Sequence, residues 1–424
     1  MPGTDPAVPN AGEQPQLARR LGTGDAVVIG LGAMIGAGIF AVLAPAAHAA
    51  GSGLLIGLAI AAVVAYCNAG SSARLAARYP ASGGSYVYGR ERLGEFWGYL
   101  AGWAFVVGKT ASCAAMALTV GLYAWPQHAH AVAVAAVVAL TAVDYTGVQK
   151  SAWLTRAIVA FVLAVLAAVV VVSLTSDAAE VARLQWGADI TGGGVLQAAG
   201  LLFFAFAGYA RIATLGEEVR DPARTIARAI FWALGVALVV YTAVAVATLV
   251  VLGPQELASS SAPLSDAVRA AGADWLEPVV RVGAVAAALG SLLALILGVS
   301  RTTLAMARDR HLPGVLAAVH PRFGVPYRAE LAVGAVVALV AAFADVRAAI
   351  GFSSFGVLLY YAVANASAWT LAPAEGRPAR VVPVVGLFGC LVLAFALPFA
   401  SVAAGLAVIA VGVALFGLRR LRVS

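Results

Sequence analysis

Two apolar segments of the chain contain residues that an uninterrupted helix does not favour. The first has four glycines between Gly30 and Gly38, and each glycine inside a helix costs about 1 kcal/mol relative to alanine. The second runs from Phe203 to Arg211 and has Gly208 near its centre. A helix that unwinds at such a place leaves backbone N–H and C=O groups without partners inside the helix. The sequence therefore indicates recognition of a ligand by main-chain groups.

The two interruptions suit opposite charges. A half-helix that begins near Gly36-Ala37-Gly38 presents free N–H groups and the positive end of its dipole, which suit a carboxylate. A half-helix that ends near Ala205-Phe206-Ala207 offers free carbonyls, which suit an ammonium group. Gly32-Ala-Met-Ile-Gly36 also fits a small-residue surface for close helix packing, but four glycines exceed what packing needs. We therefore expect local unwinding and a receptor for the two charges of an α-amino acid.

Two cations and a hydroxyl lie inside or beside these apolar segments. Lys109 is near mid-depth of its span, and it can lose a proton whereas arginine cannot. It is a candidate for a group that titrates or replaces a bound cation, although a lysine that only tethers its helix or snorkels to an interface fits as well. Arg211, close to Glu217 and Glu218, is a candidate gate. Ser291 and first-span carbonyls offer oxygen ligands for sodium.

The elements that position these residues are expected to be membrane helices. The chain has 424 residues, of which 62% are hydrophobic and 11% charged, with a mean hydropathy of +0.93, and a soluble domain does not hide so much apolar surface. A span needs about 20 apolar residues. We predict twelve, over residues 25 to 47, 53 to 77, 98 to 123, 130 to 147, 153 to 175, 192 to 215, 227 to 252, 279 to 306, 329 to 345, 349 to 371, 381 to 398 and 402 to 418.

The basic residues indicate the orientation rather than a nucleic-acid partner. Most of the 27 Lys and Arg lie at the termini and in the turns after even-numbered spans, and the positive-inside rule then puts both termini in the cytoplasm. Residues 1–23 are predicted to be a flexible cytoplasmic tail. Residues 24–420 form one transmembrane domain, in which two inverted repeats of five helices, about 24–175 and 192–371, precede two further helices, about 381–420. The interrupted helices, the first and the sixth, are then equivalent, as in transporters that bind a solute at the midplane.

Several motifs in the same order resemble those of the amino acid-polyamine-organocation transporters, the amino acid permeases with a LeuT-like fold. The resemblance extends over most of the chain. It is carried by Ile35-Gly-Ala-Gly-Ile-Phe40, Phe203 to Gly208 with Glu217-Glu218-Val-Arg-Asp-Pro222, Ser300-Arg301 with Ala305-Met-Ala-Arg-Asp309 and Leu312-Pro313, and Phe352-Ser-Ser-Phe with Leu359-Tyr-Tyr361 and Asn365.

The resemblance implies that Gly36, Ala37 and Gly38, next to Ile35, bind the carboxylate of an amino acid through their amides. Carbonyls of residues 205 to 208, around Phe206, would hold the amino group. Phe206, Tyr209 and Met34 are candidates for the wall of the side-chain pocket. The chain departs from many relatives at Ala210-Arg211, where they have Asp, and at Val162, where some proton-coupled relatives have Lys. Proton coupling by the route of those relatives is therefore in question.

Other chemistry finds little support in the sequence. Cys67, Cys113 and Cys390 lack disulfide or metal spacing, and the five histidines lack metal-ligand spacing, so we expect no cofactor and no metal centre. A membrane enzyme would need a nucleophile motif or a pair of catalytic carboxylates, and a channel a repeated filter sequence. We expect a transporter in the cell membrane that carries an amino acid, with a neutral side chain because Lys109 and Arg211 disfavour cationic cargo. Its drive would be a proton gradient or, alternatively, a sodium gradient, or it would exchange solutes.

Overall fold

Apolar helices make up nearly all of the computed structural model, which describes residues 21–79, 83–147, 152–185, 187, 190–213 and 219–423. The first half contains α1 (Thr23–Met34), α2 (Ala37–Ala41), α3 (Leu43–Ala50), α4 (Leu54–Arg78), α5 (Ser85–Leu93), α6 (Glu95–Ala124), α7 (Ala129–Tyr145) and α8 (Ala152–Thr175). The second half contains α9 (Gly192–Phe206), the 3₁₀ turn η4 (Ala207–Tyr209), α10 (Ala210–Ala213), α11 (Pro222–Ser259), α12 (Pro263–Ala270), α13 (Glu277–Arg308), α14 (Tyr327–Phe343), α15 (Val346–Trp369), α16 (Val381–Ala396) and α17 (Phe399–Val423).

Ten helical segments in the described residues are long and apolar enough to cross a membrane. They confirm the predicted all-helical, multi-pass membrane protein. The predicted ninth and eleventh spans correspond to the shorter helices α14 and α16, of 17 and 16 residues. The count of twelve spans and the inverted repeat therefore stay predictions. The predicted tail falls largely outside the described residues, and α1 begins at Thr23.

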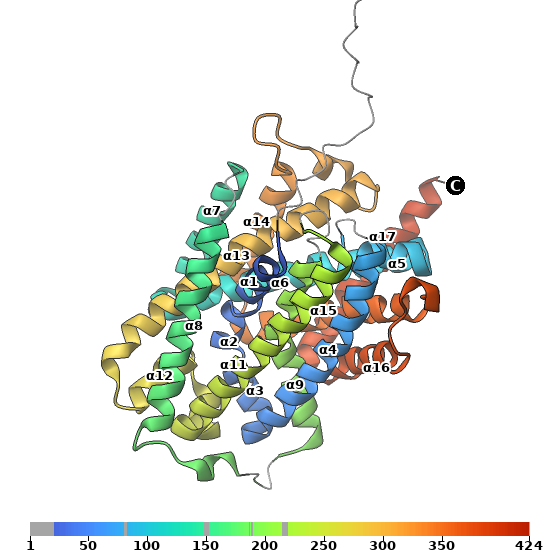
Figure 1. Ribbon diagram of the computed structural model, residues 1–424. Helices are drawn as coiled ribbons and strands as arrows, with labels where there is room; N and C mark the ends of the chain where they lie inside the picture. Colours follow the sequence, from blue (N-terminus) through green and yellow to red (C-terminus); the bar gives the residue numbers. More distant parts are fainter. Residues whose placement is uncertain are drawn as a thin grey trace, which may run out of the picture.

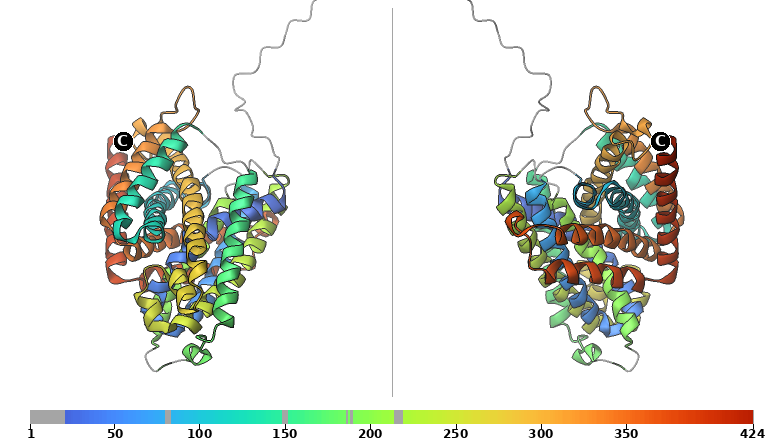
Figure 2. Two further views of the ribbon diagram at one scale, coloured as in Figure 1. Left: turned by 90° about the vertical axis from the view of Figure 1, so that its left-hand side faces the viewer. Right: turned by 90° about the vertical axis from the view of Figure 1, so that its right-hand side faces the viewer.

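The helix α6 lies inside the bundle and packs against α13 and α15, while α9 packs against α3 and α4, and α11 against α1 and α4. Figure 1 shows α1, α2 and α6 near the middle of the molecule, with α16 and α17 at one flank. The C-terminus and the turn between α13 and α14 lie at one end of the bundle, and the segment between α8 and α9 lies at the other (Figure 2). We call these the α5 end and the α12 end, after the short helices found there. That the α5 end faces the cytoplasm stays a prediction from charge.

The first span is interrupted where its glycines predict. The helix α1 ends at Met34, and Gly36, with φ −80° and ψ −139°, turns the chain out of the helix before α2 begins at Ala37. The sixth span changes from α-helix to the 3₁₀ turn η4 at Ala207 and returns to α-helix at Ala210. The second interruption is the milder one, because the Ala207 N–H still donates to the carbonyls of Phe203 and Phe204. These two places are called the first and the second break below.

Candidate functional site

The two breaks touch each other inside the bundle. A Cβ atom added at Gly208 would overlap the carbonyl of Ala33 and come within 2.6 Å of the Met34 nitrogen. One added at Gly38 would come within 2.8 Å of the Ala205 Cα. Glycine is therefore needed on both sides of this contact, because any side chain would push the backbones of the two spans apart. The close approach puts the main-chain groups of both breaks within one small region of the protein.

A cavity of about 130 Å³ opens beside the second break, between α6, η4 and α13. Ala207, Gly208 and Arg211 form one wall, and Lys109 from α6 and Ser291 from α13 face it from the other helices. Apolar side chains complete the lining, among them Phe105, Met116, Phe204 and Leu295. The structure thus brings Lys109, Arg211 and Ser291, three residues singled out by the sequence, to the same cavity.

The glycine amides of the first break are elsewhere in this conformation. Gly36, Ala37 and Gly38 are buried and are not part of the lining, and neither are Met34, Ile35 and Ala205. The Phe206 ring packs edge-on against Tyr241 with centroids 5.2 Å apart, and the Tyr209 ring stacks on Tyr361 at 5.1 Å. Of the predicted binding residues, Ala207 and Gly208 line the cavity and the others do not. Their contact with a cargo stays a prediction.

Side chains of the protein itself bond several of the carbonyls near the breaks. The Tyr241 hydroxyl lies 2.6 Å from the Met34 carbonyl oxygen and 3.0 Å from that of Ala205, and can donate to either. The Ser291 hydroxyl donates to the Gly32 carbonyl at 2.9 Å. The Lys109 ammonium donates to the Ala207 carbonyl at 3.2 Å. Unsatisfied carbonyls would be costly at this depth, and these three side chains remove that cost.

Sequence reasoning missed Tyr241 and the cavity-lining residues Phe105, Phe204 and Arg301. Tyr241 was detectable as a hydroxyl within an apolar span, a placement that usually implies a buried partner. The other residues carry no such signal, because an aromatic residue in a membrane helix or an arginine near its end is common. Glu217 and Glu218, which we expected beside Arg211, lie outside the described residues.

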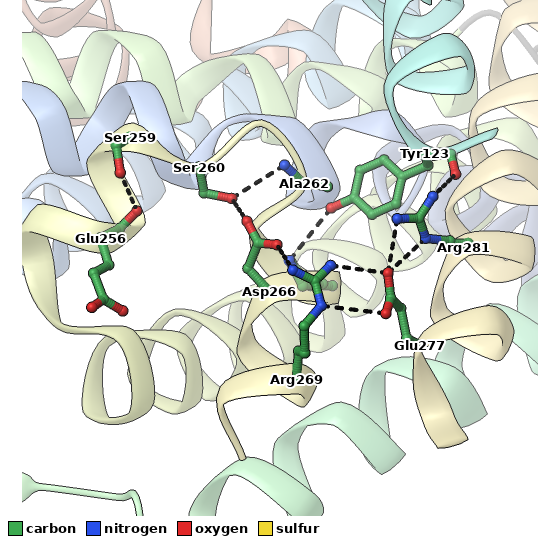
Figure 3. A network of polar contacts seen from close by, with 10 residues as sticks. Tyr123, Glu256, Ser259, Ser260, Ala262, Asp266, Arg269, Glu277 and Arg281 are labelled. Carbon is green, nitrogen blue, oxygen red and sulfur yellow. Dashed lines mark hydrogen bonds and ion pairs between the residues drawn. The ribbon is translucent and has the colours of Figure 1, made fainter. Parts of the chain in front are cut away.

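A polar network lies at the α12 end, next to the half-helix α2 that follows the first break. The Tyr123 hydroxyl donates to the Phe40 carbonyl at 2.9 Å and accepts from the Leu264 N–H at 3.4 Å, so α6, α2 and α12 are joined. Figure 3 shows Glu277 between Arg269 and Arg281, with N–O distances of 3.0 and 2.8 Å. These contacts tie α12 to α13 at the α12 end of the bundle. Exposed Arg301, by contrast, lies in the cavity lining toward the α5 end.

A larger cavity, of about 410 Å³, lies at the α12 end beside Tyr123, Ser260 and Arg347. It reaches neither break, and its lining includes Tyr123 of the polar network at that end. The smaller cavity is the better candidate for a binding site because the second break, a buried cation and an apolar wall meet there. Among the described residues no group of three or more His, Cys, Asp or Glu is placed to hold a metal ion.

Comparison with known proteins agrees with these features. The family model described as "Amino acid permease" matches residues 21–417. An uncharacterized transporter of Mycobacterium tuberculosis is 76% identical over 96% of this chain and 92% of its own length. The branched-chain amino acid permease BcaP of Bacillus subtilis is 29% identical over 76% of this chain and 74% of its own length. The methylthioribose transporter of the same bacterium is 28% identical over 90% and 89%, respectively. The chain therefore belongs to the amino acid permease family, within the amino acid-polyamine-organocation superfamily, and is a multi-pass membrane transporter.

Proposed function

We propose that the protein is a secondary active transporter that carries an amino acid with a neutral side chain across the cytoplasmic membrane by alternating access, coupled to protons. The cavity beside the second break is the observation that carries this proposal. It joins an apolar wall, suited to an aliphatic side chain, to polar groups deep in the bundle. A relative named as a branched-chain amino acid permease supports the same class of cargo.

Alternating access fits the contrast between the two ends. The Tyr123 contacts and the ion pairs of Glu277 join α2, α6, α12 and α13 at the α12 end, while the cavity lining extends along α13 to exposed Arg301. If the α5 end is cytoplasmic, as the charges predict, this conformation faces inward. The opposite state requires the network around Glu277 to separate while the α5 end closes, and broken helices are suited to such bending.

The coupling ion has two candidates. Lys109 favours the proton as the coupling ion, because an amine buried at mid-depth can change its charge during the transport cycle. Sodium is the second candidate, because the Ser291 hydroxyl lies 2.9 Å from the Gly32 carbonyl and the pair offers two oxygen ligands at the first break. Exchange of one amino acid for another would use the same cavity without either ion.

Uptake of labelled valine into proteoliposomes tests the proposal. An inward proton gradient should drive accumulation, a protonophore should abolish it, and replacing sodium by choline should leave it unchanged. Uptake that requires sodium and resists the protonophore would show that sodium is the coupling ion. Uptake only into vesicles preloaded with amino acid would indicate exchange. If none of the twenty amino acids enters under any of these conditions, the proposed function is wrong.

A further inference from the structure

The charged side chains that line the cavity beside the second break are Lys109, Arg211 and Arg301, within the described part of the chain. They come from α6, α10 and α13. Lys109 is deepest, with 5% of its surface exposed, whereas Arg301 is exposed. All three are hydrogen-bond donors without acceptor capacity. Lys109 and Arg301 therefore present positive charge and N–H groups to the cavity, which is also lined by hydroxyls of Ser112, Ser291 and Thr302.

The place expected for a ligand's ammonium group is already taken. Of the second-break carbonyls at the cavity lining, that of Ala207 accepts from the Lys109 ammonium at 3.2 Å, and that of Gly208 accepts from the Ala210 N–H. The neighbouring acceptors of Met34 and Ala205 lie at the Tyr241 hydroxyl, outside the lining. A second ammonium would have to displace Lys109 or lie beside it, and like charges a few ångströms apart repel each other strongly in a poorly solvated site.

A carboxylate meets the opposite situation. An ammonium group has three N–H donors, so Lys109 can bind a carboxylate oxygen while it keeps its bond to Ala207. The carboxylate would then neutralise a cation that is costly at this depth. A carboxylate therefore gains from the same group that repels an amine.

We propose that the cavity recognises its cargo by the carboxylate, through Lys109, and that the α-amino group is dispensable, so that small apolar carboxylates are accepted as well as amino acids. This rests on the proposed function and names the chemical group that the site reads. The apolar lining from Phe105, Met116, Phe204 and Leu295 receives the aliphatic part. A volume of about 130 Å³ fits a small organic molecule, since an apolar cavity of about 150 Å³ holds benzene. Valine and its one-group analogues are therefore suitable probes.

Competition with labelled valine in proteoliposomes distinguishes recognition of the carboxylate from recognition of the amino group. The carboxylate-only analogue is 3-methylbutanoate, and the amine-only analogue is valinamide. We expect 3-methylbutanoate to inhibit valine uptake within about threefold of unlabelled valine, and valinamide to be at least about tenfold weaker, the range of one charged hydrogen bond. Inhibition by valinamide alone would overturn the inference. So would a failure of both analogues, because that result means that both groups are required.

Variants of Lys109 test whether this residue recognises the carboxylate. Lys109→Gln should weaken 3-methylbutanoate about 10- to 100-fold, while valinamide is unchanged or improved. The ratio of the two affinities is the readout, since a purely structural defect lowers both together. Lys109→Arg, which keeps the charge, should preserve the wild-type ratio. Arg308→Gln is the matched control, because Arg308 is an exposed cation of α13 outside the cavity lining. An unchanged ratio in Lys109→Gln contradicts the inference.

Thermal shifts of the detergent-purified wild-type protein keep this inference separate from the proposed function. A ligand that binds the native form raises the melting temperature whether or not it is transported. A shift with 3-methylbutanoate and none with valinamide supports recognition by the carboxylate, even if valine uptake fails. If valine is taken up but only valinamide shifts the melting temperature, the proposed function stands and the inference falls. The absence of a shift with 3-methylbutanoate at concentrations where valine produces one also overturns it.

Discussion

The first and the second break have similar sequence signals but different surroundings. At the first break the helix ends completely between Met34 and Ala37, yet its glycine amides are packed and lie off the cavity lining. At the second break the helix only tightens into a 3₁₀ turn, yet Ala207 and Gly208 line the cavity. The first break, where the helix is more strongly distorted, is therefore the one whose main-chain groups lie away from the cavity. Irregular backbone shows where main-chain groups are released, and neighbouring helices decide which of them a ligand can reach.

The partners of the two breaks also differ in kind. The first break is covered partly by side chains, since a Cβ added at Gly36 would overlap the Ser291 hydroxyl. The second break is in contact with backbone, because a Cβ added at Gly208 would meet Ala33 and Met34 main-chain atoms. A side chain can be shortened by mutation, and a backbone cannot. Substitutions at the two glycines should therefore differ in cost and in whether a second mutation rescues them.

The largest effect is expected for Gly208→Ala. The added methyl group must displace the end of α1, and we expect a loss of about 3 kcal/mol or more in the free energy of unfolding together with loss of valine uptake. Melting temperature and uptake measure the two effects. Gly298→Ala is the control, because Gly298 lines the same cavity and a Cβ there would meet nothing within 4 Å. Near-wild-type stability of Gly208→Ala would show that the breaks do not touch as described.

A smaller and reversible effect is expected for Gly36→Ala. The new methyl group collides with the hydroxyl and Cβ of Ser291, and overpacking of this kind costs about 2 kcal/mol. Adding Ser291→Gly removes both colliding atoms, so the double variant should melt at a higher temperature than Gly36→Ala. The same Ser291→Gly change combined with Gly208→Ala should rescue nothing. Equal behaviour of the two pairs would remove the distinction between the breaks.

The smallest effect is expected for Tyr241→Phe. The change removes the hydroxyl that lies between the Met34 and Ala205 carbonyls, and a lost hydrogen bond costs about 1 kcal/mol. Because these carbonyls are off the cavity lining, affinity for valine should change less than stability. Melting temperature and valine competition give the two values, and Tyr66→Phe, at a residue 58% exposed, is the control. A large loss of affinity with unchanged stability would place Tyr241 in the binding site instead.

Much of the fold follows from the sequence because it depends on local chemistry. Stretches of apolar residues long enough to span a bilayer predict the helices, and the observed bounds agree closely, as for α7 at residues 129–145 and α14 at residues 327–343. Other boundaries differ. The helix α11 begins at Pro222 and continues to Ser259 through a kink at Gly253, α17 covers residues 399–423 instead of 402–418, and α5 and α12 are separate helices between predicted spans. Hydropathy indicates depth in the membrane, and it does not distinguish a short helix from a turn at the surface.

The two breaks beside the candidate site were predictable, whereas the residues that line the cavity were predictable only in part. Gly36 and Gly208 marked the breaks, and Lys109 and Ser291 stood out as polar residues in apolar spans. The bond from Lys109 to the Ala207 carbonyl was not predictable, because it joins residues 98 positions apart. Nor did the sequence show that the Phe206 and Tyr209 rings pack against Tyr241 and Tyr361. These contacts depend on how α6, α11 and α15 are rotated about their axes.

The sequence by itself determined that the chain is a helical membrane protein with two interrupted spans, because glycine content and apolar length act within a single segment. It also determined the family, through motifs read in order along the chain. Only the tertiary structure decided which released carbonyls lie at the cavity and which of them are bonded by Tyr241, Ser291 or Lys109. The reason is that every polar group deep in a membrane needs a partner, and packing alone selects that partner from residues that are distant in sequence.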